Sequence, residues 1–155
     1  MLSEGTAAPV FSLPNQDGDT VELEELRGQW VVLYFYPRAD TPGCTKEACG
    51  FRDVWTAYED AGARVLGVSD DPVDDLLKFA EKYDLPFELL SDESGDVSAT
   101  YESYGEKNVF GNVVEGVFRN TYLIDPEGTI AEVYGNVSPE GHAEAVLEDI
   151  EGHRS

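Results

Sequence analysis

The strongest apolar run of the chain is WVVLYFY at residues 30–36. It is too short for a buried helix and rich in β-branched and aromatic side chains, which favours a central strand covered on both faces. A second run of this kind occupies residues 63–69. Between them, residues 42–60 place apolar side chains on one helical face and predict a helix that Gly62 closes. Strand, helix and strand in this order predict a parallel pair with a right-handed crossover.

The remaining pattern predicts two hairpins and further helices around this unit. Residues 8–26 predict a hairpin added at the edge of the sheet, because polar residues at 15–19 form a turn and polar and apolar side chains alternate in the strand that follows it. A second hairpin is expected over residues 119–134, because Asp125-Pro126-Glu127-Gly128 is a strong turn signal. Residues 105–116 fit either a surface loop or a weak hairpin. The other expected elements are helices from Pro72 to Tyr83, at 97–104 and at 139–150, and a strand at 87–90.

The length indicates one domain over residues 1–155. This length is enough for one sizeable core, and no linker-like stretch, repeat or low-complexity segment divides the chain. The first residues lack a basic region followed by an apolar one, and no apolar run approaches the length of a membrane span. We therefore expect a soluble, cytoplasmic α/β protein that does not bind membranes.

The chain is very acidic, with 32 Asp and Glu residues against 10 Lys and Arg residues and a net charge of −22. The acidic residues are spread through every segment, which argues against nucleic acid as a partner because phosphate binding needs a basic face. Such even acidity with only four lysines is typical of proteins from cells that keep molar salt in the cytoplasm. An ordinary acidic protein with solvated faces is the alternative. We expect a halophilic protein that needs salt to screen its own repulsion.

Both cysteines lie where the central strand passes into the following helix, in the segment YPRADTPGCTKEAC at residues 36–49. Pro37 ends the strand, Thr41 is a plausible N-cap, and a proline follows it at the first helical position. Cys44 then falls in the first turn of the helix. Free backbone N–H groups and the positive end of the helix dipole favour a thiolate there.

The surrounding charges support a reactive sulfur. The positive charges of Arg38 and Lys46 balance the negative charges of Asp40 and Glu47 in this segment, which is therefore the least acidic part of the chain. Two buried, inert cysteines beside an ordinary helix start are the alternative. The specific order of strand, proline, turn, Thr-Pro-Gly-Cys and helix favours a redox site.

These residues also carry a family resemblance. The pattern from Pro37 through Thr41 to Cys44 resembles the active-site signature of the peroxiredoxins, and a second cysteine five residues later is similar to the Q type, also called bacterioferritin-comigratory proteins. Weaker similarity extends along nearly the whole chain, including residues 8–13, 78–83 and 119–125. The resemblance implies a thioredoxin-like fold with N-terminal and central additions, and a peroxidase that reduces hydrogen peroxide and organic hydroperoxides.

The implied reaction is an in-line displacement in which one peroxide oxygen transfers to sulfur. It requires an ionised thiol, an aligned peroxide and hydrogen bonds to the leaving oxygen. The resemblance makes Arg119 the active-site arginine, although a solvated ion pair is the usual role of a single arginine. Thr41 would contact sulfur and substrate, or only cap the helix. Pro37 would shield the sulfur as well as end the strand, and Glu47 is interpreted as a helix-surface residue.

Cys49 is the expected resolving cysteine, which would condense with a sulfenic acid on Cys44. In an intact helix, Cα atoms five residues apart are separated by about 8.6 Å, whereas a disulfide needs less than about 7 Å. The first turns must therefore unwind in each cycle. By the resemblance, thioredoxin or a similar dithiol protein then regenerates the pair. We expect the enzyme to be a monomer or at most a weak dimer.

Two other classes remain open from the residues alone. A general thiol-disulfide oxidoreductase uses the same fold, but usually with cysteines three apart and a cis-proline before the late strand; here Phe118-Arg119-Asn120 lacks a proline. The second class is a non-catalytic thioredoxin-like binding module or a zinc site, which would need further ligands. The two histidines, His142 and His153, lie in or beyond the last helix, where exposure is expected. The sequence thus indicates neither a metal nor another cofactor.

Overall fold

The computed structural model describes residues 1–154. Its strands are β1 (Ser12–Pro14), β2 (Thr20–Glu22), β3 (Trp30–Phe35), β4 (Ala63–Ser69), β5 (Glu88–Ser91), β6 (Tyr104–Val109), β7 (Asn112–Val117), β8 (Thr121–Ile124) and β9 (Ile130–Tyr134). Its helices are the 3-10 helix η1 (Leu23–Leu26) and the α-helices α1 (Pro42–Asp53), α2 (Trp55–Asp60), α3 (Val73–Tyr83), α4 (Asp96–Thr100) and α5 (His142–Arg154).

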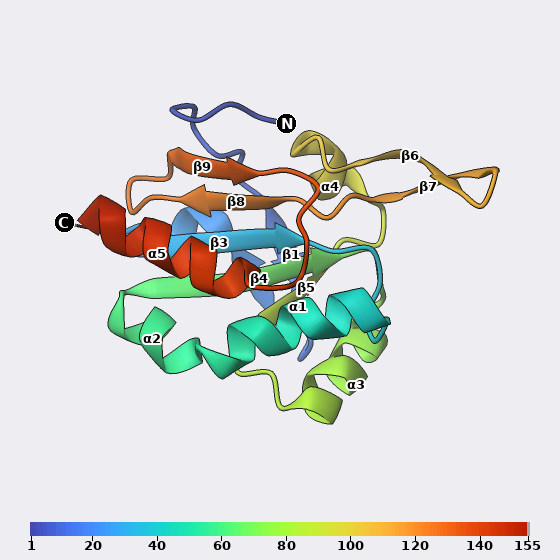
Figure 1. Ribbon diagram of the computed structural model, residues 1–155, viewed down its shortest axis with the longest axis horizontal. Coiled ribbons are helices and arrows are strands. Elements are labelled where there is room, and N and C mark those ends of the chain that lie inside the picture. Colours follow the sequence, from blue (N-terminus) through green and yellow to red (C-terminus); the bar gives the residue numbers. More distant parts are fainter. Residues whose placement is uncertain (155) are drawn as a thin grey trace.

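The main sheet has the strand order β5-β4-β3-β8-β9 (Figure 1). β3 pairs in parallel with β4 and antiparallel with β8, so the sheet is mixed. This confirms the predicted parallel pair and the late antiparallel hairpin. The N-terminal hairpin β1–β2 forms a separate pair that reaches the edge strand through a bridge between Asn15 and Leu90, as the prediction of an edge addition required.

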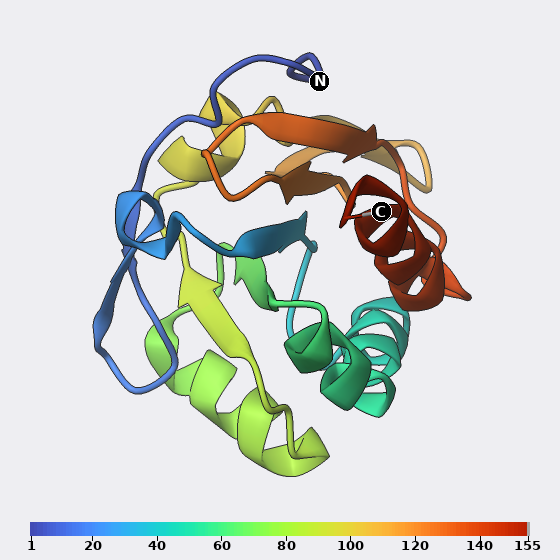
Figure 2. The same ribbon diagram turned by 90° about the vertical axis from the view of Figure 1, so that its left-hand side faces the viewer.

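Helices cover both faces of the sheet (Figure 2). Val32, Tyr34 and Tyr36 point to one face, where they pack against side chains of α1, α2, α3 and α5. Alternate residues of the same strand, including Leu33 and Phe35, point to the other face, in a cluster with side chains of η1 and of the segment around α4. A strand buried on both sides explains why residues 30–36 read as one continuous apolar run.

Two predicted helices differ from the structure. The helix expected over residues 42–60 is divided into α1 and α2, because Val54 leaves helical geometry at φ −112 and ψ 19. The helix expected at 97–104 ends at Thr100, since Glu102 has a left-handed backbone at φ 53 and the chain then enters β6. Residues 105–116, for which loop and hairpin remained open, belong to the hairpin β6–β7, which projects from the body (Figure 1).

None of the helices within residues 1–154 has both the length and the apolar character needed to cross a lipid bilayer.

Candidate active site

Cys44 lies in the first turn of α1, beyond the carboxyl end of β3, and is only 1% exposed. The connecting loop is held in place by Asp71, whose Oδ2 accepts hydrogen bonds from the Ala39 N–H at 2.7 Å and from the Ser69 hydroxyl at 2.8 Å. Asp40 takes a left-handed backbone at φ 59 before the helix begins. The loop therefore fixes where the first turn, and with it the sulfur, stands relative to the sheet.

Arg119 is the cation at this sulfur. Its Nη2 lies 3.4 Å from Sγ of Cys44, and its Nη1 donates to Oε1 of Glu47 at 2.9 Å. A Cβ atom on Gly43 would come within 3.0 Å of Nη2, so the absence of a side chain there lets the guanidinium lie against the first turn. One planar group thus contacts both the sulfur and a carboxylate of the same helix.

The backbone of Arg119 is placed by strand pairing. The residue stands just before β8, and the Phe35 N–H donates to the carbonyl of Asn120 at 2.8 Å, which continues the pairing of β8 with β3. The carbonyl of Arg119 accepts from the Val137 N–H at 2.8 Å. Because β8 runs antiparallel to β3, its beginning lies beside the end of β3, and two residues 75 apart meet.

Glu47 is buried, at 1% exposure, so its interpretation as a surface residue was wrong. It lies three positions after Cys44 in α1 and therefore on the same inward face. Burial raises the pKa of its carboxyl group from 4.5 to about 7, although Arg119 acts in the opposite direction. Within residues 1–154 its second oxygen, Oε2, has no hydrogen-bond partner. An acidic residue on an otherwise apolar helix face was the sequence signal that could have revealed this position.

Thr41 and Pro37 border the site. Thr41 occupies the N-cap position, but its hydroxyl donates to the carbonyl of Arg38 at 2.8 Å and makes no side-chain capping bond within the described chain. Pro37 lines a cavity of about 600 Å³ together with Arg119 and Lys107. The threonine hydroxyl is therefore bonded within its own loop, and the proline lines the same cavity as the arginine.

Cys49 lies in the same uninterrupted helix as Cys44, and both are free thiols. Cys49 is half-buried, whereas Cys44 is buried. The Arg52 side chain, one turn after Cys49, donates to the carbonyl of Tyr83 at 2.8 Å and ties the later part of α1 to the end of α3. In this conformation the two sulfurs stand on a regular helix.

His142 is buried, contrary to the expectation of exposure, whereas His153 is exposed and lies 3.1 Å from Glu132. The His142 ring contacts the Thr121 hydroxyl at 2.9 Å and packs edge-on against Phe51. Burial, and then the charge of Arg119, lower the pKa of His142 from 6.5 to about 4. A polar residue at the start of α5 is buried because the helix begins directly over the sheet.

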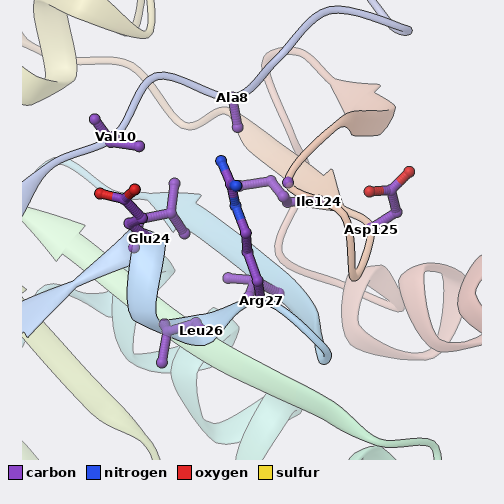
Figure 3. Close-up of a pocket in the computed structure, with 10 residues that line it drawn as sticks. Ala8, Val10, Glu24, Leu26, Arg27, Ile124 and Asp125 are labelled. Atoms are coloured by element: carbon purple, nitrogen blue, oxygen red, sulfur yellow. The ribbon is translucent and has the colours of Figure 1, made fainter.

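A different, smaller pocket lies at the opposite end of β3 (Figure 3). Arg27 extends into it between Ala8 and Ile124, and the space that remains is about 10 Å³. This is enough for about one water molecule. Neither cysteine lines it, so it is not part of the thiol site.

Known proteins resemble this chain over nearly its whole length. Residues 5–133 match the model of the AhpC/TSA family. The chain is 49% identical over 146 residues to the putative peroxiredoxin bcp of Coxiella burnetii, covering 94% of this chain and 97% of that relative. It is 44% identical over 152 residues to peroxiredoxin Bcp of Escherichia coli strain K12, covering 98% and 97%.

Solved structures agree in fold. The bacterioferritin comigratory protein of Xanthomonas campestris, studied for its alkyl peroxide reduction activity, superimposes with a TM-score of 0.89 at 35% identity and covers 94% of this chain and 92% of its own. A Xylella fastidiosa PrxQ mutant gives a TM-score of 0.93 at 31% identity and covers 100% and 99%. The expected thioredoxin-like fold, with a mixed central sheet flanked by helices, is thereby confirmed.

Proposed function

The chain belongs to the AhpC/TSA family as a thiol-dependent peroxidase of the Bcp or Q type, and on this premise we propose that Cys44 is the sulfur that attacks the peroxide. The observation that carries the proposal is the guanidinium of Arg119, which lies 3.4 Å from the buried Cys44 sulfur at a helix N-terminus. A fixed cation and free backbone N–H groups stabilise a thiolate and the negative charge of the transition state.

In the first step the Cys44 thiolate attacks one oxygen of R–O–O–H along the O–O axis. An S–O bond forms as the O–O bond breaks, sulfur is oxidised to the sulfenic acid, and the leaving R–O⁻ takes up a proton to become an alcohol, or water when R is hydrogen. Two electrons pass from sulfur to the peroxide. Arg119 donates hydrogen bonds to the developing charge, and it is held ready by Glu47.

Thr41 and Pro37 complete the proposed site. Rotation of the Thr41 hydroxyl away from the Arg38 carbonyl would let it bond the bound peroxide, since one hydroxyl can donate only one proton at a time. Pro37, which lines the cavity together with Arg119, would exclude water from the sulfur without offering an N–H group.

Cys49 is the proposed resolving residue. Its thiol attacks the Cys44 sulfenic acid, an S–S bond forms, and the oxygen leaves as water. The regular α1 helix keeps positions five apart at about 8.6 Å between Cα atoms, which is longer than the limit of about 7 Å for a disulfide. The helix must therefore open between the two cysteines. Opening breaks the ion pair of Glu47 with Arg119 and that of Lys46 with Glu140.

A thioredoxin-type dithiol protein supplies the electrons that return the disulfide to two thiols, as in the peroxiredoxin family. For this chain we propose thioredoxin itself, a monomeric enzyme and a reducing cytoplasm, since a redox role for two free thiols suits that compartment. The net charge of −22, with acidic residues along the whole chain, supports a cytoplasm at molar salt.

The test compares two matched variants. Cys44→Ser should abolish reduction of hydrogen peroxide, measured by NADPH consumption coupled through thioredoxin reductase and thioredoxin in molar KCl. Cys49→Ser should retain the first turnover in stopped flow and accumulate a sulfenic acid that dimedone traps on Cys44. Equal loss of the first turnover in both variants would overturn the assignment of the two roles.

A further inference from the structure

The cavity beside Arg119 is larger than a peroxide bond requires. Its volume of about 600 Å³ falls within the range of about 300–1,000 Å³ that is usual for small-molecule sites. Pro37, Lys107, Phe118 and Arg119 are among its lining residues, and Lys107 lies on strand β6 of the projecting hairpin. There is room for the organic part of a substrate beside the Arg119 guanidinium, which itself contacts the Cys44 sulfur.

In the wall formed by Phe118 and Lys107, the Phe118 ring packs closely against a glycine inside a strand. A Cβ atom on Gly105 would come within 3.1 Å of the Phe118 ring, whereas one on Gly116 would make only an ordinary contact with Cε of Lys107 at 3.6 Å. Nζ of Lys107 stands 5.8 Å from the centre of the Phe118 ring. Glycine weakens a strand unless a close approach requires it, and the approach of the Phe118 ring accounts for Gly105.

Lys107 differs from other lysines of this chain. Lys46 and Lys82 are ion-paired on the surface, with side chains 56% and 57% exposed. Lys107 is half-buried, and among residues 1–154 no carboxylate pairs with it. Glu102, the acidic residue at this cavity, is instead bonded to the N-terminal amine at 3.0 Å. In a chain of net charge −22, this cavity therefore presents an ammonium group that has no ion-pair partner among residues 1–154.

We propose that Lys107 binds the carboxylate of an organic hydroperoxide whose –OOH group lies at Cys44. A half-buried ammonium group loses part of its hydration, and an anionic ligand would compensate this loss. Burial lowers the pKa of Lys107; Cys44 opposes this, and smaller effects come from Arg119, which lowers the pKa, and Asp70, which raises it. Phe118 and Pro37 then cover the carbon skeleton between the two ends. This role rests on the proposed peroxidase function and makes Lys107 a specificity-determining residue.

The test uses two hydroperoxides with one carbon skeleton, 3-hydroperoxy-3-methylbutanoate and its methyl ester, which differ in charge. We expect Lys107→Gln to lower kcat/KM for the carboxylate by about tenfold or more and for the ester by less than about twofold. Lys107→Arg should keep most of the preference. Lys78→Gln, which removes the charge of an exposed lysine on α3, is the matched control and should treat both substrates as the wild type does.

A second measurement does not depend on turnover. The product, 3-hydroxy-3-methylbutanoate, should slow alkylation of Cys44 by iodoacetamide in the wild type and the Lys78→Gln variant, but not in Lys107→Gln. If Lys107→Gln lowered kcat/KM equally for both substrates, the role of Lys107 would be overturned. The same holds if the product protected Cys44 in Lys107→Gln as well as it does in the wild type. Neither result would affect the proposed peroxidase activity. Failure of the wild type to reduce either compound or hydrogen peroxide would instead refute the proposed function.

Discussion

Glu47→Gln is expected to change how stability depends on pH. The Glu47 carboxyl group is 1% exposed, and burial raises its pKa from 4.5 to about 7 despite the hydrogen bond from Arg119. In the unfolded chain the group ionises near 4.5. Between these values the folded protein keeps a proton that the unfolded chain has lost. The free energy of unfolding contributed by Glu47 therefore falls as pH rises through this window.

The structure also gives the size of the effect. One pKa unit corresponds to about 1.36 kcal/mol, so a rise from 4.5 to about 7 corresponds to about 3 kcal/mol of stability lost on ionisation. Glutamine has nearly the same shape and does not titrate. The free energy of unfolding of Glu47→Gln, minus that of the parent, should thus increase by about 3 kcal/mol between pH 4.5 and pH 8.

Urea unfolding followed by circular dichroism measures this difference. The experiment is done in molar KCl and in a Cys44→Ser background, which removes the reactive thiol. Glu81→Gln, which changes an exposed glutamate on α3, is the matched control and should run parallel to the parent at every pH. If the unfolding free energies of Glu47→Gln and its parent also ran parallel with pH, the buried carboxyl group would not titrate in this range. That result would refute the prediction.

Three further predictions concern the site and the charge of the chain. Arg119→Lys should slow the first oxidation in stopped flow by at least about tenfold, or about 1.4 kcal/mol, because a point charge replaces a planar fork that reaches sulfur and carboxylate together; an unchanged rate would remove Arg119 from the site. His142→Gln should show a smaller loss of unfolding free energy as pH falls from 6.5 to 4 than the wild type. In the folded protein the pKa of His142 is lowered from 6.5 to about 4, so over this range the unfolded chain takes up a proton that the folded protein excludes, at a cost of about 3 kcal/mol. Equal losses of unfolding free energy in His142→Gln and the wild type, measured by urea unfolding, would contradict this. The midpoint of thermal unfolding should rise with KCl from about 0.1 M into the molar range, and a flat or falling midpoint would defeat the halophilic interpretation.

Local patterns sufficed for the parts of this protein that are encoded within a few residues. The continuous apolar run at residues 30–36 identified the central strand because both of its faces are buried. The order of Pro37, Thr41 and Cys44 placed the thiol in the first turn of a helix, since the N-cap position and the following proline act through neighbouring backbone groups. The hairpin around residues 125–128 likewise followed from its turn residues.

Tertiary structure alone decided how distant residues surround the thiol. Only the antiparallel pairing of β8 with β3 brings the Arg119 guanidinium to the Cys44 sulfur, and from the residues alone a surface ion pair was the better interpretation of that arginine. Glu47 and His142 were misjudged for the same reason. A polar side chain on a helix says little about burial until it is known which elements pack over it, and burial is what moves the pKa of both groups. Sequence thus determined the chemistry available at each position, whereas the packing of β8, α1 and α5 determined which groups meet and how strongly each is charged.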